Sequence, residues 1–242
     1  MAFAVLTRDP ADTVVYAAAL APLEVVAMPV TRIVDPVRAT DWRPLLEGID
    51  AIVVASPRAA QQLASAALGT SLPAVWAVGP ATKRALDIAK IPAQVPHDVR
   101  DGAGLARALI ASGGVRGKKI LVPRAEEGRT EPIELLRAAG AEVIEAIAYR
   151  TVPAPADDPL LARGKQLLEA GDASVCCVFA PSQVAALAQL VPLPALRTRF
   201  CAIGETTAAA VRAAGVADVA IAPAPTPEGM AQAVRSVYPA RR

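Results

Sequence analysis

The chain has 242 residues, a formal net charge of +2, 54 % apolar residues and only 3 % aromatic residues. This length suits one large domain or two domains of ordinary size. An apolar content dominated by Ala, Val and Leu suits helices packed on parallel sheets. The sequence has no run of five like charges and no aromatic stacking platform, which argues against a nucleic-acid-binding surface.

The cysteines and the apolar segments indicate the cellular compartment in which we expect the protein to reside. Cys176, Cys177 and Cys201 fall in apolar stretches that we expect to be buried strands. An odd number of cysteines without framework spacing favours a reduced, cytosolic setting. The most apolar window, 14–30, contains two prolines and a glutamate and is a poor membrane span. Arg8 interrupts the apolar start, so we expect no secretory signal peptide.

The chain opens with a predicted strand–helix–strand unit. The apolar segment 4–6 predicts a strand, residues 11–21 a helix, and residues 25–28 a second strand. An extended, β-prone connector, 31–36, follows and ends in proline, as linkers between domains often do.

The next stretch, 51–108, recurs at 174–234, which indicates duplicated α/β units rather than a short-period solenoid. In three of the matching pairs, the two residues are separated by the same number of positions. In a fourth pair, the separation is one position shorter. The matching pairs are Gly79 with Gly204, Thr82 with Thr207, Gly104 with Gly229, and Ser56-Pro57 with Ala180-Pro181.

Each copy follows the same physical pattern. Residues 52–55 predict a buried strand, Ser56 a helix N-cap and Pro57 the first helical position. Residues 75–78 predict the next strand, and Gly79 allows a tight turn into the following helix.

Asp101 and its repeat equivalent Thr226 are predicted caps of the third helix in each copy. Every predicted helix therefore begins where a strand ends, at the sheet edge where open α/β folds bind ligands. Free N–H groups and the helix dipole make such an edge an anion site. The alternative is that these caps only end loops, as in any α/β protein.

A second strand–helix–strand unit lies between the two copies. It consists of a predicted strand at 119–122 ending in Pro123-Arg124, a helix at 131–139 closed by a glycine, and a strand at 143–148. A second proline-ended connector, 149–153, follows. The repeat leaves open whether each half folds on itself or the first unit packs with the remainder of the second half.

The ordered segments resemble the uroporphyrinogen-III synthase family over most of the chain. They are VLTR, VVASPRAAQQL, WAVGPATKRAL, PR…EGR…LLRAAGAEV, AYRTV, AIGETTAAAVRAAG and APTPEGMAQAV. The resemblance implies two similar α/β domains, each a parallel sheet flanked by helices, joined by a two-stranded connector. It implies a discontinuous first domain (1–34 plus 153–242), a second domain (37–149), and connectors at 31–36 and 149–153.

The resemblance also implies an activity. The family cyclises the linear tetrapyrrole hydroxymethylbilane with inversion of the terminal pyrrole ring and loss of water, in haem biosynthesis, without a cofactor or metal. His97 is the single histidine, no cluster has metal-ligand spacing, and no dinucleotide fingerprint follows a strand. The implied partner is this octa-acid small molecule. We expect a cytoplasmic monomer with no nucleic-acid or membrane partner, and a transient contact with the preceding pathway enzyme remains open.

Tyr149 is the candidate proton donor, because the family places a functional tyrosine at this connector position and a phenol stays protonated at neutral pH. The alternative role is packing between domains. Ala180 stands where the family usually keeps a serine, with Ser182 close by. The residues expected to bind substrate are Thr7, Arg8, Ser56, Pro57, Arg58, Gly79, Thr82, Lys83, Arg124, Ser182, Gly204, Thr206, Thr207, Thr226 and Gly229.

Two other functions compete with this interpretation. A non-catalytic two-domain paralogue that binds a tetrapyrrole or another anion would share the fold, since fold does not determine function. The enzyme that makes the bilane needs an accessible cysteine to tether its cofactor, whereas all three cysteines here are expected to be buried.

Overall fold

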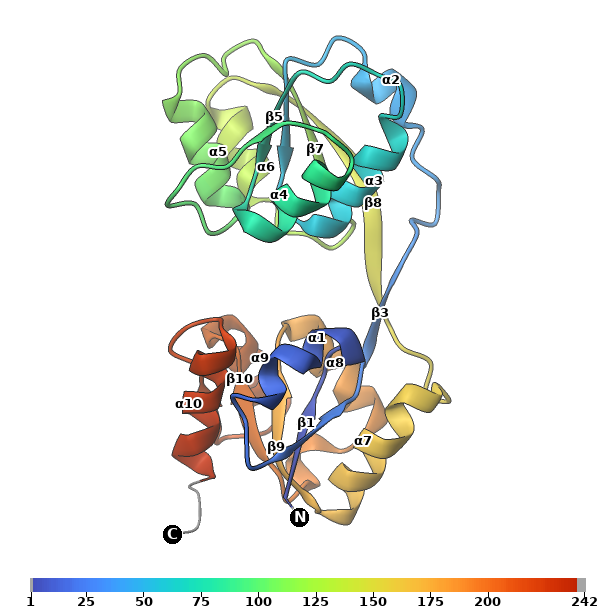
Figure 1. Cartoon of the computed structure of the whole chain (residues 1–242), viewed down its shortest axis with the longest axis vertical. Coiled ribbons are helices and arrows are strands. Elements are labelled where there is room, and N and C mark those ends of the chain that lie inside the picture. Colours follow the sequence, from blue (N-terminus) through green and yellow to red (C-terminus); the bar gives the residue numbers. More distant parts are fainter. Residues whose placement is uncertain (1, 239–242) are drawn as a thin grey trace. The chain divides into compact units, whose positions relative to one another are not determined.

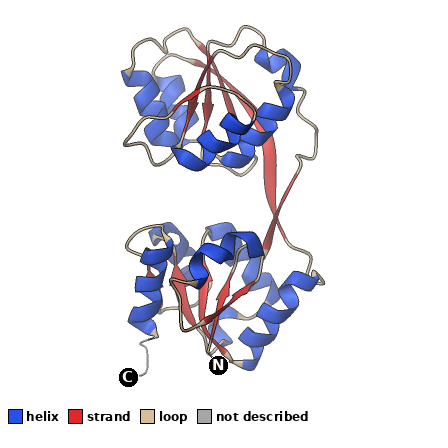
Figure 2. Cartoon of the chain, viewed as in Figure 1, coloured by secondary structure: helices blue, strands red, loops and turns tan. Residues whose placement is uncertain are grey.

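The computed structural model describes residues 2–238 (Figure 1). The chain divides into two compact units. Unit 1 contains Met1–Arg32 and Val152–Arg242, and unit 2 contains Ile33–Thr151. Each unit is a sheet with helices on both faces (Figure 2).

The sheet of unit 1 has the strand order β11-β10-β9-β1-β2, and each neighbouring pair is parallel. Its strands are β1 (Phe3–Leu6), β2 (Glu24–Ala27), β9 (Ala173–Val178), β10 (Arg199–Ala202) and β11 (Val219–Ile221). Its helices are α1 (Pro10–Ala17), α7 (Pro159–Ala170), α8 (Pro181–Leu190), α9 (Glu205–Ala213) and α10 (Pro227–Val237), with a short 3-10 turn at Leu193–Ala195.

The sheet of unit 2 has the order β3-β8-β7-β4-β5-β6. Its strands are β3 (Thr31–Val34), β4 (Ala51–Val54), β5 (Ala74–Ala77), β6 (Ala93–Gln94), β7 (Lys119–Ala125) and β8 (Glu142–Pro153). Its helices are α2 (Trp42–Leu46), α3 (Pro57–Ala66), α4 (Gly79–Ile88), α5 (Gly102–Ala111) and α6 (Glu131–Ala138). The chain passes between the units within β3 and within β8.

The two sheets share one strand order. The series β6-β5-β4-β7-β8 in unit 2 corresponds, strand for strand, to β11-β10-β9-β1-β2 in unit 1. This correspondence follows from the sequence repeat, because β4 and β9 open the two copies. The predicted fold class, two similar α/β domains built on parallel sheets flanked by helices, is confirmed.

Two apolar layers form in unit 1 because successive strand residues point to opposite faces. Cys176 belongs to the layer that contains Phe200 and the inner faces of α7, α8 and α9. Cys177 belongs to the other layer, with Met230 and the inner faces of α1 and α10. The three thiols are free and buried, as expected, and burial raises the pKa of Cys176. They act as small apolar groups.

Unit 2 repeats this arrangement. Ile52 and Val54 of β4 pack with α3 and α4 on one face, and Val53 packs with α5 and α6 on the other. A buried side chain of this size contributes about 1.5–3 kcal/mol. These alternating layers hold the ends of β4, β5 and β7, where the helices that follow them begin.

Several element bounds differ from the sequence prediction, and the largest differences are at the first helix and at β8. The first helix ends at Ala17 instead of Ala21, and a turn follows. Pro22 disfavours helical backbone at the residue before it, which argues against the predicted end at Ala21. Strand β8 runs through the second connector to Pro153, because the β-branched and aromatic residues there favour extended backbone. Tyr149 therefore lies within a strand.

Candidate functional site

The predicted helix caps lie at the carboxyl ends of the strands. The side chain of Ser56 accepts from an amide of α3 at 3.1 Å, Asp101 from α5 at 2.8 Å and Thr226 from α10 at 3.1 Å. Each cap satisfies one amide of its helix and leaves others in the first turn without an intrahelical partner. These edges are therefore able to bind anions.

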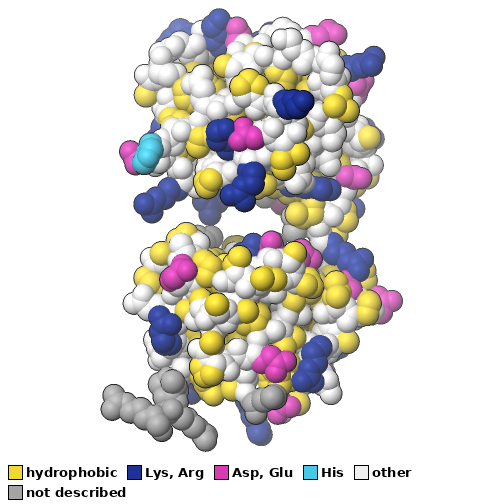
Figure 3. All heavy atoms as spheres, in the orientation of Figure 1, with side chains coloured by type: hydrophobic (Ala, Val, Ile, Leu, Met, Phe, Trp, Pro, Cys, Tyr) yellow, Lys and Arg dark blue, Asp and Glu magenta, His cyan; other side chains and the backbone are white. Residues whose placement is uncertain are grey.

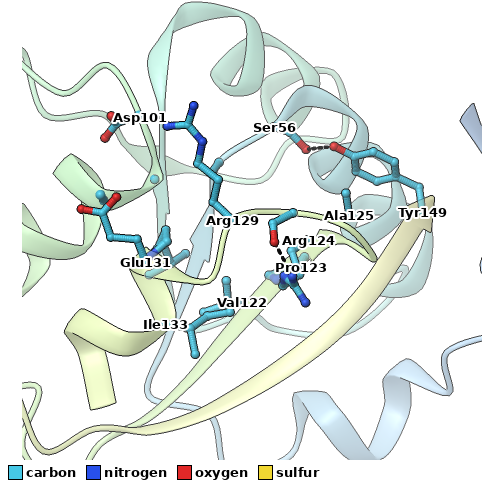
Figure 4. A pocket seen from close by; sticks show the side chains of 16 residues that line it. Ser56, Asp101, Val122, Pro123, Arg124, Ala125, Arg129, Glu131, Ile133 and Tyr149 are labelled. Atoms are coloured by element: carbon cyan, nitrogen blue, oxygen red, sulfur yellow. Dashed lines mark hydrogen bonds between the residues drawn. The ribbon is translucent and has the colours of Figure 1, made fainter. Parts of the chain in front are cut away.

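A pocket of about 210 Å³ lies in unit 2 at the carboxyl ends of β4 and β7 and the starts of α5 and α6 (Figure 4). It brings together three of the residues predicted from sequence, Ser56, Arg124 and Tyr149. Apolar side chains such as Val53 and Val122 make up much of its lining. The pocket therefore combines an apolar surface with hydroxyl and guanidinium groups.

Tyr149 and Ser56 are hydrogen-bonded at this pocket. The Tyr149 hydroxyl donates to Ser56 Oγ at 3.2 Å (Figure 4). Ser56 Oγ also accepts from the Ala59 amide at 3.1 Å. A serine oxygen has two acceptor positions and one proton. With both acceptor positions occupied, the Ser56 proton is available to a group in the pocket.

Arg124 forms part of the pocket wall. Its side chain is 15 % exposed, pairs with Glu145 at 3.1 Å and donates to the Gly128 carbonyl at 2.5 Å. Its Nε is buried and has no hydrogen-bond partner within the described part of the chain. Two of its nitrogens thus bond to residues of unit 2, and these bonds fix the guanidinium beside the pocket.

The other predicted residues of unit 2 do not line this pocket. Arg58 bonds to the Gln61 side chain at 3.3 Å, Lys83 pairs with Asp87 at 2.7 Å, and Thr82 is buried. Pro57 occupies the first turn of α3, and Gly79 has a φ of +69°, which favours glycine. The basic and hydroxyl groups of α3 and α4 therefore lie outside the pocket wall. Figure 3 shows Lys and Arg side chains scattered over the face in view.

At the equivalent edge of unit 1, Thr7 is fully buried and donates to Gln183 Oε1 at 2.7 Å. The same oxygen accepts from the Phe179 amide at 3.0 Å. Ala180, at the N-cap position of α8, offers no side-chain hydrogen bond. Gln183 thus stabilises this helix start, and Ser182 beside it is exposed.

Sequence reasoning missed Gln183. Its position three residues after the N-cap, the spacing of a capping box, was the available signal.

Arg8 lies over two aromatic rings at the end of β1. Its guanidinium carbon is 5.0 Å from the centroid of Phe179 and 5.8 Å from that of Tyr16. It also pairs with Asp12 at 3.1 Å. Burial raises the pKa of Tyr16, and Arg8 partly opposes this shift. Arg8 is thereby held at the edge of the sheet.

The first turn of α9 carries Thr206, which is exposed, and Thr207, which is buried. Gly204, at its N-cap, has extended backbone, with a φ of −177°, and so differs from its repeat equivalent in unit 2. Gly229 is required by packing, since a Cβ there would lie 2.1 Å from the Ala224 carbonyl oxygen. The Thr226 hydroxyl is used as the cap of α10.

Neither a metal-ion site nor a membrane-crossing helix occurs in the part of the chain that the structure describes. Among residues 2–238, no group of three or more His, Cys, Asp or Glu side chains could hold a metal ion. No helix of the described part of the chain has both the length and the apolar character needed to cross a membrane.

The fold and these edges define a two-unit α/β protein in which capped helices begin at the carboxyl ends of the strands. A family model described as "Uroporphyrinogen-III synthase HemD" matches residues 15–232. The chain belongs to this family of cyclising lyases in tetrapyrrole biosynthesis, which act on a small-molecule tetrapyrrole. The sequence-based family assignment is confirmed.

Solved structures with this fold include proteins from Helicobacter pylori and Thermus thermophilus. The uroporphyrinogen-III synthetase of Helicobacter pylori is 16 % identical, with a TM-score of 0.70 and coverage of 98 % of this chain and 99 % of that one. A mutant uroporphyrinogen III synthase of Thermus thermophilus is 19 % identical, with a TM-score of 0.59 and coverage of 98 % of each chain. A search of curated protein sequences gave no match.

Proposed function

We propose that the unit 2 pocket takes part in the cyclisation of hydroxymethylbilane to uroporphyrinogen III, with Ser56 and Tyr149 as the proton-donating pair. The observation that carries the proposal is the 3.2 Å bond from the Tyr149 hydroxyl to Ser56 Oγ, beside an apolar pocket, in a chain of this family. Ser56 donates its proton to the departing hydroxyl of the substrate, and Tyr149 supplies the replacement.

The reaction needs little from any one side chain. Departure of the protonated hydroxyl as water leaves an azafulvene cation. The terminal pyrrole attacks through its substituted carbon, and the resulting spiro intermediate reopens and closes with the ring inverted. A pyrrole carbon then loses its proton, which restores aromaticity and reprotonates the Tyr149–Ser56 pair.

Inversion requires selection of one path over another. Closure without inversion is the uncatalysed outcome, and a hundredfold preference for inversion corresponds to only about 2.7 kcal/mol. Holding the substrate in one folded conformer supplies energies of that size. Proton donation to the leaving hydroxyl adds roughly a factor of 10².

In this proposal, strand-end loops bind the substrate carboxylates. Free amides and dipoles at helix starts contribute roughly 0.3–1 kcal/mol per anionic group. Arg8 and Arg124 lie at such ends, and each is held by contacts within its own unit. The exposed strand-end residues Ser182 and Thr206 keep their proposed binding role, whereas the hydroxyls of Thr7, Thr82 and Thr207 are buried.

We further propose a cytoplasmic monomer that receives its substrate through transient contact with the preceding enzyme. The free, buried cysteines fit a reducing compartment. Transfer between enzymes would limit spontaneous closure of the reactive bilane. Sedimentation of the isolated protein tests the monomer.

The product-isomer assay tests the proposed activity, with Tyr149→Phe testing the donor. The wild type should convert hydroxymethylbilane to the type III isomer, and the variant should do so more slowly with the same isomer preference. A carrier protein would bind the bilane and leave the isomer ratio at its spontaneous value.

A further inference from the structure

The pocket of unit 2 is lined by four charged residues, Asp101, Arg124, Arg129 and Glu131. Three of them are engaged within the unit. Asp101 caps α5, Arg124 pairs with a carboxylate at 3.1 Å, and Glu131 pairs with a guanidinium at 2.8 Å. Arg129 makes no hydrogen bond or ion pair with any residue from 2 to 238. Arg129 is therefore the charged side chain of the pocket whose guanidinium has no partner among the described residues, which leaves it available to a ligand.

The position of Arg129 suits this role. It lies in the loop between β7 and α6 and is exposed. In the view of Figure 4 its side chain extends from the loop, with the guanidinium between Asp101 and Ser56, while Val122 and Ile133 lie on the other side of the pocket. A cation thus adjoins an apolar lining, an arrangement that suits a flat ring carrying an anionic substituent.

We infer that Arg129 is a specificity residue that binds a carboxylate substituent of one pyrrole ring, while the apolar lining of the pocket contacts the ring. This inference rests on the proposed function and adds a residue to it. A guanidinium matches a carboxylate through two parallel hydrogen bonds. Gly102, in the first turn of α5, lines the same pocket, and amides of a first helical turn lack intrahelical partners.

The packing of Gly102 keeps the start of α5 close to the pocket. A Cβ at Gly102 would lie 2.9 Å from Pro132 Cγ and 3.3 Å from Ala55 Cβ. The chain there packs tightly against the start of α6 and the end of β4. The carboxylate on Arg129 would therefore meet the positive end of the α5 dipole, which favours anions.

Two simpler roles compete with substrate binding. Arg129 could be a solvated surface charge, and such groups contribute little. It could also pair with Asp101 across the pocket in the free protein. Both alternatives predict that the affinity for substrate is insensitive to the charge at this position, so a charge series separates them from the inference.

The test measures steady-state kinetics of Arg129→Ala, Arg129→Lys and Arg129→Glu with hydroxymethylbilane. The matched control is Arg116→Ala, because Arg116 is also exposed but precedes β7 and lies away from the pocket lining. Removal of one hydrogen-bonded charge should raise KM roughly tenfold in Arg129→Ala, with kcat within about twofold of wild type. KM should rise further in Arg129→Glu and less in Arg129→Lys, and added salt should reduce these differences.

Melting temperatures should stay at the wild-type value throughout the series, which separates binding from folding. If KM in Arg129→Ala equals that of the Arg116→Ala control while the wild type forms the type III isomer, the inference is wrong and the proposed function stands. If the wild type forms no type III isomer, the proposed function fails and the inference fails with it.

Discussion

Removal of the Tyr149 hydroxyl tests the proton-donating pair most sharply. Tyr149→Phe keeps the ring and deletes only the donor that bonds to Ser56 Oγ at 3.2 Å. Ser56 and its bond from the Ala59 amide remain, so a donor stays in the pocket. We therefore expect turnover to fall roughly 10- to 100-fold, at most the factor assigned to proton donation. This loss corresponds to about 1.4–2.7 kcal/mol in the barrier.

Ser56→Ala completes a double-mutant cycle. It removes the group that contacts the substrate in this mechanism, and it also removes the N-cap of α3, which costs about 1 kcal/mol of stability. In the double variant, Tyr149→Phe should have almost no further effect, because proton transfer from Tyr149 through Ser56 to the substrate stops when either hydroxyl is missing. Rates that multiply in the double variant would mean that the two hydroxyls act independently.

The assay is single-turnover conversion of freshly made bilane, quenched at short times so that spontaneous closure is subtracted. The control is Tyr238→Phe, since Tyr238 ends α10 in unit 1 and does not line the pocket. It should keep the wild-type rate. Wild-type turnover in Tyr149→Phe would assign Tyr149 to packing and leave positioning of the substrate as the source of catalysis.

Two further predictions concern other residues. His97→Ala should leave turnover within about twofold of wild type, because the side chain is fully exposed and does not line the pocket, and loss of activity with an intact fold would contradict the mechanism. Gly229→Ala should lower the melting temperature clearly, since the new Cβ would meet a backbone oxygen at 2.1 Å and overpacking costs about 1–3 kcal/mol. Gly204→Ala, with no atom within 4 Å of the new Cβ and extended backbone, should change stability much less; equal melting temperatures would refute the packing argument.

The sequence predicted the parts of the structure that depend on neighbouring residues. Ser56, Asp101 and Thr226 cap helices as expected, because a cap needs only its own side chain and an amide three residues on. The repeat likewise indicated two related sheets, because each copy encodes the same succession of strands and helices.

Contacts between distant segments could not be read in this way. The bond between Tyr149 and Ser56 joins residues 93 positions apart, and the bond between Thr7 and Gln183 joins residues 176 positions apart. Both depend on the order of strands in a sheet. Local spacing does not encode that order.

The missing serine at Ala180 shows how a local departure is offset by a distant contact. The sequence indicated the loss of a polar group at the start of α8. Gln183 accepts hydrogen bonds from the Phe179 amide and from the Thr7 hydroxyl. These two bonds connect the start of α8 to the end of β1. The role of Gln183 depends on β1 lying beside β9, which only the folded sheet reveals.

The most direct measurement is the isomer composition of the product formed from hydroxymethylbilane by the purified wild-type protein, without added metal or nucleotide. We predict the type III macrocycle, formed faster than spontaneous closure and separable by chromatography from the spontaneous type I isomer. A product that kept the spontaneous isomer ratio, despite binding of the bilane, would contradict the account and leave the chain as a binding protein of this family.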